Sequence, residues 1–393
     1  MPYSTTRKSS GMGSIRKKTV KRNGKEYTFW EARFTAGYDP KTGKQIQRSI
    51  SGKTQREVRE KLKKALLDLE SDTYIEPCEI TVGEWLDTWI EEYLSSVKVL
   101  TKQNYANQVN AHLKPCLGGY QLGELNTHTI QRFYNDLQRK ENLSPKTVKN
   151  IHGVLHSALQ QAIDNGYIHR NPTEACKLPK VVRPEINPLE PFQITQLLQE
   201  AQSDSYKNLF TAALFTGMRQ GELLGLSWDC VNFDTGIITV KRQLQCKDGE
   251  YFMVTPKNGK ARAILPAPLV MEALREERIK QQTAQQAAGK LWDNPFNLVF
   301  TDACGKNLVR RTVVKHFKAI AQRTGLDEKV RFHDLRHSFA VTSLQAGDDI
   351  KTVQANLGHA TAAFTLQVYA HVNESMRRES ADRMQKFYEA MIR

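Results

Sequence analysis

The chain has 393 residues and a formal net charge of +15, because 57 lysines and arginines outnumber 42 aspartates and glutamates. A content of 39% hydrophobic and 25% charged residues is that of an ordinary globular protein and excludes a disordered or fibrous chain. The basic excess indicates a polyanionic partner, either nucleic acid or an anionic membrane surface. Most of the excess lies in residues 1–72, where 18 basic and 8 acidic side chains give +10.

The sequence gives no sign of a membrane span or a secretory signal. No stretch approaches the roughly 20 apolar residues of a membrane helix, and Met1 to Lys8 contains no apolar signal core. We therefore expect a cytoplasmic protein. Its six cysteines form no C-x-x-C pair, which predicts buried or incidental thiols in place of disulfides or a structural zinc site.

Residues 1–75 are predicted to form a small sheet with one helix. Asn23-Gly24 is a strong hairpin signal, and a second turn covers Asp39 to Gly43, so three strands should form a meander. Apolar residues at helical spacing follow Thr54 and would cover one face of the sheet. The opposite face would then carry lysines, arginines and a few aromatic residues. A solvated basic sheet without a ligand is the alternative interpretation.

Residues 80–178 are predicted to form a helical bundle. Thr81 to Glu84 has the pattern of a capping box, and Ser144-Pro145 places an N-cap before a proline in the first helical position. Four prolines then fall within Leu178 to Pro191, a stretch that cannot continue a helix and reads as an interdomain linker.

Residues 190–393 mix helices with a few strands. Strand-like runs cover Ile237–Arg242, Tyr251–Thr255 and Ala261–Leu265, while helical patterns occupy most of the remainder. Because strands and helices do not alternate, we expect a small antiparallel sheet within a mainly helical domain. The fold class of the whole chain is therefore multidomain α+β.

Common nucleotide and metal motifs find no support. The chain has neither a P-loop nor a dinucleotide-binding glycine motif. His333 and His337 are four residues apart, as in some zinc hydrolases, but Asp334 follows the first histidine and Arg336 lies between the two. A cation beside two potential ligands argues against a metal, and we expect neither a metal nor a cofactor.

The same residues fit an anion site better. Arg219 precedes Glu222 by three residues, and His333 precedes Arg336 by three, so each pair lies on one face of a helix. Two guanidiniums and an imidazole can cradle a phosphate, because arginine offers planar bidentate donors and stays charged. Taken singly, each pair could be a surface ion pair or a structural histidine.

Two further features complete the candidate set. Lys257 is expected at a hairpin turn between two strands, from which its ammonium group could reach a neighbouring cleft, although an exposed turn lysine is the simpler reading. His359 follows Leu357-Gly358 and precedes Tyr369 by ten residues. A tyrosine can accept a phosphoryl group that arginines hold in line, because it can later leave as a phenolate.

This combination of R-x-x-E, a turn lysine, H-x-x-R, L-G-H and a tyrosine resembles the tyrosine recombinase/integrase family of phages and conjugative transposons. The family shares its catalytic domain with type IB topoisomerases. Residues 190–393 resemble the family's catalytic domain, and residues 80–178 resemble its core-binding domain. Residues 1–75 are similar in shape and charge to its arm-binding domains.

The resemblance implies a metal-free strand transfer without ATP. Arg219 and Arg336 would bind the non-bridging oxygens of the scissile phosphate, and Tyr369 would attack the phosphorus to form a 3′-phosphotyrosyl intermediate. Lys257 would protonate the departing 5′-oxygen.

Three more residues receive roles from the resemblance. His333 would accept the tyrosine proton or donate a hydrogen bond to the phosphate, and His359 would donate to the same phosphate. Glu222 would orient Arg219.

The implied partner is double-stranded DNA at core-type and arm-type sites, bound by a homotetramer that integrates and excises a mobile element, with a possible accessory protein for excision. The C-terminal tail would dock on a neighbouring protomer or pack on its own domain. A sheet can enter the major groove, so the candidate arm-site contacts are Arg16, Lys18, Lys21, Arg33 and Arg48. The alternatives are a DNA-relaxing enzyme of the type IB topoisomerase kind and a non-catalytic DNA-binding regulator.

Overall fold

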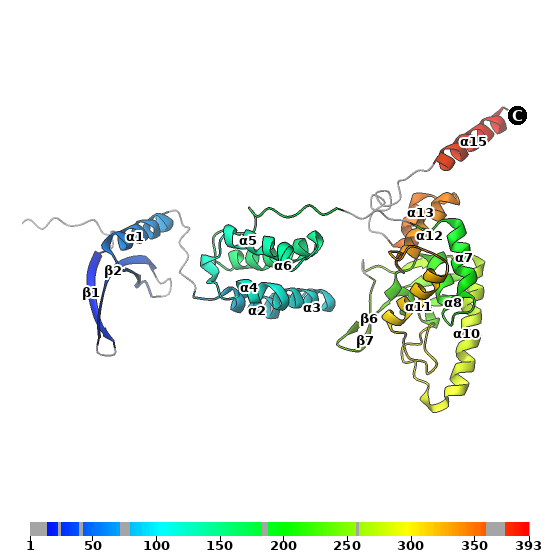
Figure 1. Cartoon of the computed structure of the whole chain (residues 1–393), viewed down its shortest axis with the longest axis horizontal. Coiled ribbons are helices and arrows are strands. Elements are labelled where there is room, and N and C mark those ends of the chain that lie inside the picture. The colour runs from blue at the N-terminus through cyan, green and yellow to red at the C-terminus, as the bar shows by residue number, and fades with distance from the viewer. Residues whose placement is uncertain are drawn as a thin grey trace, which may run out of the picture. The chain divides into compact units, whose positions relative to one another are not determined.

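The N-terminal residues form a three-stranded antiparallel meander, as predicted (Figure 1). Its strands are β1 (Ser14–Arg22), β2 (Lys25–Tyr38) and β3 (Gln45–Gly52), and α1 (Gln55–Glu70) packs against one face. Ala32 on β2 pairs with Ile15 on one side and Ile50 on the other, so these three apolar residues share the face that meets α1. That register fixes the two faces of the sheet.

The computed structural model describes residues 14–22, 25–38, 42–70, 79–182, 188–256, 259–358 and 374–392. By its contacts the chain divides into two units, Met1–Val182 and Arg183–Arg393. Among the helices in these ranges, none is long and apolar enough to cross a membrane.

The rest of the first unit is helical. The predicted capping box is present, since the Glu84 amide donates to Thr81 Oγ1 at 3.2 Å and the Thr81 amide donates to Glu84 Oε2 at 2.8 Å. Ser144 caps the last helix, which begins at Pro145. The elements are α2 (Val82–Glu92), α3 (Val99–Gln108), the π-helix η1 (Val109–Leu113), α4 (Lys114–Leu117), η2 (Leu122–Glu124), α5 (Thr127–Arg139) and α6 (Pro145–Asp164).

The second unit is mainly helical with two small sheets. Its helices are α7 (Pro191–Ala201), α8 (Lys207–Thr216), α9 (Gln220–Leu224), η3 (Trp228–Cys230), α10 (Pro268–Ala288), η4 (Gly289–Leu291), α11 (Arg310–Arg323), α12 (Asp334–Gln345), α13 (Ile350–Leu357) and α15 (Glu374–Met391). Its strands are β4 (Val231–Asn232), β5 (Ile237–Val240), β6 (Gln243–Lys247), β7 (Glu250–Val254) and β8 (Arg262–Ile264). The multidomain α+β fold class is confirmed.

The pairing of these strands differs from the sequence prediction. We expected β7 and β8 to flank the turn at Lys257 as one hairpin, and we did not foresee a separate strand at Gln243–Lys247. Instead β7 pairs with β6, and β8 pairs with β5 in a sheet ordered β4-β5-β8. Because Gly249 supplies a tight left-handed turn, β6 and β7 satisfy each other's backbone groups. The strands on either side of Lys257, β7 and β8, therefore belong to different sheets.

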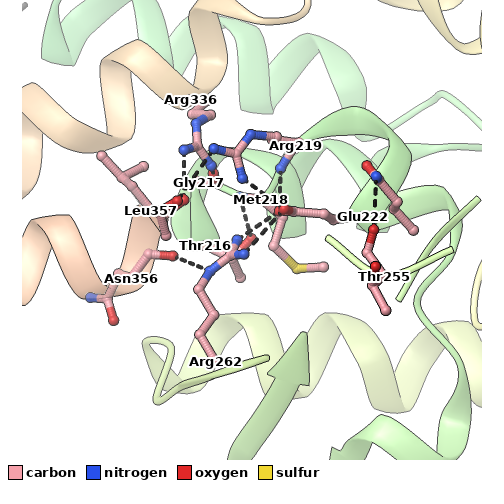
Figure 2. A network of polar contacts seen from close by, with 12 residues as sticks. Thr216, Gly217, Met218, Arg219, Glu222, Thr255, Arg262, Arg336, Asn356 and Leu357 are labelled. Atoms are coloured by element: carbon pink, nitrogen blue, oxygen red, sulfur yellow. Dashed lines mark hydrogen bonds and ion pairs between the residues drawn. The ribbon is translucent and has the colours of Figure 1, made fainter. Parts of the chain in front are cut away.

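An apolar core holds the helix ends that carry the motifs. Phe210 of α8, Phe317 of α11 and Phe332 lie with ring centroids 5.8 to 6.3 Å apart. A smaller cluster joins α12 to α13 through Phe339 and Leu357. These buried contacts fix the C-terminal ends of α8 and α13 and the start of α12, which surround the polar network in Figure 2.

Candidate active site

The R-x-x-E motif lies where α8 ends and α9 begins. Gly217 ends α8 with a φ of +60°, a left-handed conformation that glycine adopts without strain. A β-carbon at this position would come within 2.4 Å of the Phe339 ring. The resulting turn places Arg219 immediately before α9, where its backbone amide and its guanidinium both donate to Glu222, at 2.9 and 2.8 Å.

The carboxylate of Glu222 is the centre of the polar network. Its side chain is completely buried, with 0% of its surface exposed. Burial alone would raise its pKa, but hydrogen bonds and charge from Arg262, together with those of Arg219, lower the pKa to about 2. Glu222 is therefore ionised at neutral pH and accepts a hydrogen bond from the Arg219 guanidinium (Figure 2).

Arg262 on β8 is the second arginine bound to Glu222, and the sequence analysis did not identify it. Its Nη1 and Nη2 donate to Oε1 and Oε2 of Glu222 at 3.1 and 2.6 Å, a bidentate pair. Its Nε donates to the carbonyl of Asn356 at 2.7 Å, at the end of α13. The available signal was a single arginine in a short predicted strand, two residues before Ile264. Many strands at the edge of a sheet carry such an arginine without a functional role.

Arg336 joins three helix ends. Only 3% of this residue is exposed. Its Nη1 donates to the carbonyl of Gly217 and its Nη2 to the carbonyl of Leu357, both at 2.6 Å. The guanidinium thus lies between the C-terminal ends of α8 and α13 (Figure 2).

The charges of this cluster favour an anionic ligand. Arg219, Arg262 and Arg336 contribute three positive charges, and Glu222 contributes one negative charge. The four side chains together carry two net positive charges. The side chain of Arg219 is 23% exposed, so a ligand can contact this arginine. A phosphodiester group, with one negative charge and two non-bridging oxygens, matches such donors.

His333 directly precedes α12, three residues before Arg336. Partial desolvation, followed by the nearby His337 and Arg336, lowers the pKa of its imidazole to about 4. The residue as a whole is exposed to solvent. Because its pKa is lowered from the usual histidine value of 6.5, the ring is neutral at pH 7.

The two histidines of this segment pack against each other. The rings of His333 and His337 meet edge to face with centroids 5.0 Å apart, and Asp334 is bound to Arg331 at 2.8 Å. Across the described ranges, no group of three or more histidine, cysteine, aspartate or glutamate side chains is placed to hold a metal ion.

Three predicted site residues, Lys257, His359 and Tyr369, lie outside the described residues. The chain is described on both sides of Lys257 and up to Gly358, which precedes His359. The structure therefore brings together Arg219, Glu222 and Arg336 in one network (Figure 2). It places His333 immediately before the helix that carries Arg336.

The predicted basic residues of the N-terminal sheet divide between its two faces. Arg16, Lys18 and Arg33 lie on the face opposite α1, where all three approach Glu31. Lys21 and Arg48 lie on the face that meets α1, because each is an even number of residues along its strand from Ile15 or Ile50. Lys21 pairs there with Glu26 at 3.1 Å. Sequence alternation could not make this distinction, since charged residues occupy both faces of β1.

Glu31 is a second residue that the sequence analysis missed. It is only 6% exposed, and it accepts hydrogen bonds from Arg16 at 2.7 Å and from Lys18 at 3.0 Å. Arg33 lies 3.6 Å away. Hydrogen bonds from Arg16 and Lys18 hold the pKa of Glu31 below its usual range. One carboxylate thus gathers three cations on the open face of the sheet.

Comparison with known proteins places this site in a family. Residues 187–376 match the model of the phage integrase family, and residues 81–138 match that of the phage integrase N-terminal SAM-like domain. A tyrosine recombinase XerC of Roseiflexus is 32% identical over 243 residues, which are 60% of this chain and 72% of that protein. A XerC-like tyrosine recombinase of Caldanaerobacter subterraneus is 29% identical over 374 residues, covering 89% and 94% of the two chains.

A solved structure with the same fold is the Tn1549 transposon integrase in complex with a circular intermediate DNA. It has a TM-score of 0.66 and 24% identity, over 78% of this chain and 99% of that one. The family match and the recombinase relatives define the class of protein, a tyrosine-type DNA strand transferase. The chain belongs to the phage integrase family of tyrosine-type site-specific DNA recombinases.

Proposed function

We propose that this recombinase integrates and excises its mobile element with Tyr369 as nucleophile and Arg219 and Arg336 as phosphate ligands. The observation that carries the assignment is the cluster around Glu222, in which three arginines accompany one carboxylate. Such a cluster stabilises a phosphate whose charge grows in the transition state. Fixed donors that contact the phosphate, here Arg219 and Arg336, contribute about 3–4 kcal/mol each.

Cleavage forms one bond and breaks one. The Tyr369 oxygen attacks phosphorus, the bond from phosphorus to the 5′-oxygen breaks, and the DNA remains attached as a 3′-phosphotyrosyl ester. Lys257 gives a proton to the departing 5′-oxygen, which leaves as a hydroxyl group. Rejoining reverses these steps with the 5′-hydroxyl of another strand. No external energy source is needed, because the ester conserves the energy of the broken bond.

His333 suits the role of base for the tyrosine proton. An imidazole must be unprotonated before it accepts a proton, and the lowered pKa of His333 keeps it unprotonated at physiological pH. His359 would donate to the phosphate from the turn that follows α13. Glu222 positions Arg219 and does not contact DNA, because it is completely buried.

The remaining segments supply DNA binding. Residues 190–393 form the catalytic domain in this proposal, residues 80–178 bind the core-type site, and residues 1–75 bind an arm-type site. The open face of the N-terminal sheet supports the last assignment, since it presents Arg16, Lys18 and Arg33 together. Separate modules would allow one protomer to contact two DNA sites, with phosphate contacts supplying much of the affinity.

Assembly into a tetramer on DNA would use the C-terminal helix α15. Its exposed apolar side chains are Met384, Phe387, Tyr388 and Met391. Large apolar groups of this kind favour burial against another protein surface. A partner protomer would supply that surface, and an accessory protein would shift the balance towards excision.

A recombination assay tests the proposal. A core-site duplex, selected from random DNA by binding to the full-length protein, is mixed with a second labelled copy in EDTA and without nucleotide. We expect recombinant duplexes that carry strands from both copies. Relaxation of a supercoiled plasmid that carries the same site, with no exchange of strands between the two duplexes, would contradict the proposal and indicate topoisomerase activity.

A further inference from the structure

Arg262 connects three parts of the second unit that are far apart in sequence. Its guanidinium binds both oxygens of Glu222 on α9 and the carbonyl of Asn356 on α13, while its backbone belongs to β8. Its side chain is 11% exposed and that of Glu222 is 0% exposed. Water therefore competes little for these contacts, which makes the geometry of the pair more rigid than a surface ion pair.

The contact with Glu222 determines how Arg219 is held. Glu222 Oε1 accepts from Arg219 at 2.8 Å and from Arg262 at 3.1 Å. Its Oε2 accepts from the Arg219 backbone amide and from Arg262. With both oxygens held in this way, the carboxylate has a single orientation. Without Arg262, the carboxylate could rotate and Arg219 would lose its fixed direction.

Arg262 also supports the chain that leads to His359. Gly358 ends α13 with a φ of +62°. A β-carbon on Gly358 would lie 3.0 Å from Nη1 and 3.1 Å from Cδ of Arg262. The glycine backbone therefore lies directly against the arginine side chain. The hydrogen bond from Arg262 Nε to the Asn356 carbonyl holds the last turn of α13, which leads into Gly358.

We propose that Arg262 is a positioning residue for strand cleavage, which orients Arg219 through Glu222 and fixes the turn before His359. This inference rests on the proposed function and deepens it. Arg262 does not contact the phosphate in this assignment. Its substitution should lower the rate of the chemical step while leaving DNA affinity nearly unchanged, because the DNA-contacting side chains remain present.

The test is single-turnover cleavage of the selected core-site duplex by full-length protein. Each variant is assayed on the natural phosphodiester and on a duplex with a bridging 5′-phosphorothiolate at the scissile position. A thiolate leaves without protonation, since thiols have a pKa of about 8.5. The second substrate therefore removes the need for a general acid and separates Arg262 from the role of Lys257.

We expect R262Q to cleave about 100-fold more slowly on both substrates, with a dissociation constant within about threefold of the wild type. R262K should recover part of the rate, because it keeps the charge but cannot bind both carboxylate oxygens and the Asn356 carbonyl. K257A should be slow on the phosphodiester and restored on the phosphorothiolate. R323Q, which removes an exposed arginine paired with Glu200, should cleave at the wild-type rate.

Two results would overturn the inference. One is cleavage by R262Q at the wild-type rate, and the other is full recovery of R262Q on the phosphorothiolate, which would assign Arg262 to leaving-group protonation. Should R262Q fail to fold, R262K decides the question by the same comparison of two substrates. Failure of the wild type to form any adduct would instead contradict the proposed function.

Discussion

The guanidinium of Arg262 binds both carboxylate oxygens of Glu222, at 3.1 and 2.6 Å, across 40 residues of sequence. This pair is buried, and it lies beside the contact between Glu222 and Arg219. A carboxylate with two arginine partners remains charged and fixed in direction. Arg219, which is proposed to contact the phosphate, is therefore oriented through Glu222 by Arg262 on β8.

Removal of the Glu222 charge should destabilise the region around α9. In E222Q, the two arginines remain in a buried site without a carboxylate, and breaking a buried pair costs about 3 kcal/mol or more. Hydrogen–deuterium exchange of the peptides covering α9 and α13 should lose roughly 100-fold protection at pH 7. E276Q, which removes the exposed partner of Lys207, is the control and should leave exchange unchanged. Equal protection in E222Q and wild type would contradict the structure.

The Glu222 pair also predicts a dependence of stability on pH. The pKa of Glu222 falls from 4.5 to about 2 on folding, so the folded state favours the ionised form. Its contribution is complete above pH 4.5 and is lost as the pH falls towards 2, which amounts to about 3 kcal/mol. Urea unfolding of wild type and E222Q should therefore differ at pH 7 and converge near pH 2. A difference in the free energy of unfolding that stays constant from pH 7 to pH 2 would contradict the lowered pKa of Glu222.

His333 should titrate well below an ordinary histidine. Desolvation, with the neighbouring His337 and Arg336, lowers its pKa to about 4, while Asp334 acts in the opposite direction. The unfolded chain therefore binds the proton more tightly, and this group costs stability as the pH falls from 6.5 towards 4. NMR of the imidazole carbon-bound protons, assigned with H333Q, should give a midpoint near 4 in the free protein. A midpoint near 6.5 would remove the argument that His333 is a neutral base.

Glu31 should help the N-terminal sheet to select its own DNA site, although the negative charge of Glu31 repels DNA. It gathers Arg16, Lys18 and Arg33 on one face, so E31Q should release these side chains. Fluorescence anisotropy should show weaker binding of E31Q to a selected arm-site duplex and unchanged or tighter binding to random DNA. E26Q removes an exposed carboxylate paired with Lys21 and should tighten both slightly. If E31Q instead binds both duplexes more tightly and to the same extent, Glu31 only repels DNA and does not position the three cations.

Sequence reasoning found the parts of the site that depend on local spacing. Arg219 with Glu222, and His333 with Arg336, were recognisable from their spacing of three residues. The expectation that each pair lies within one helix was not met, because Arg219 and His333 directly precede α9 and α12. Arg262 was not, since its contact with Glu222 depends on how β8 packs against α9, which no short-range pattern encodes. The split of Lys21 and Arg48 from Arg16 likewise required the register of β1, β2 and β3. Strand β6 was missed because its five residues, which alternate polar and apolar side chains, directly follow the strand-like run Ile237–Arg242 and do not stand out as a separate strand.

The most direct test of the account is trapping of the covalent intermediate at Tyr369. A nicked core-site duplex, which loses a short fragment after cleavage, is incubated with the full-length protein in EDTA, and the products are separated by denaturing electrophoresis. We expect a protein–DNA band with wild type, and with Y369F no band while binding of the same duplex persists. A covalent band that survives in Y369F, or that disappears in EDTA, would contradict the proposed nucleophile or the metal-free mechanism.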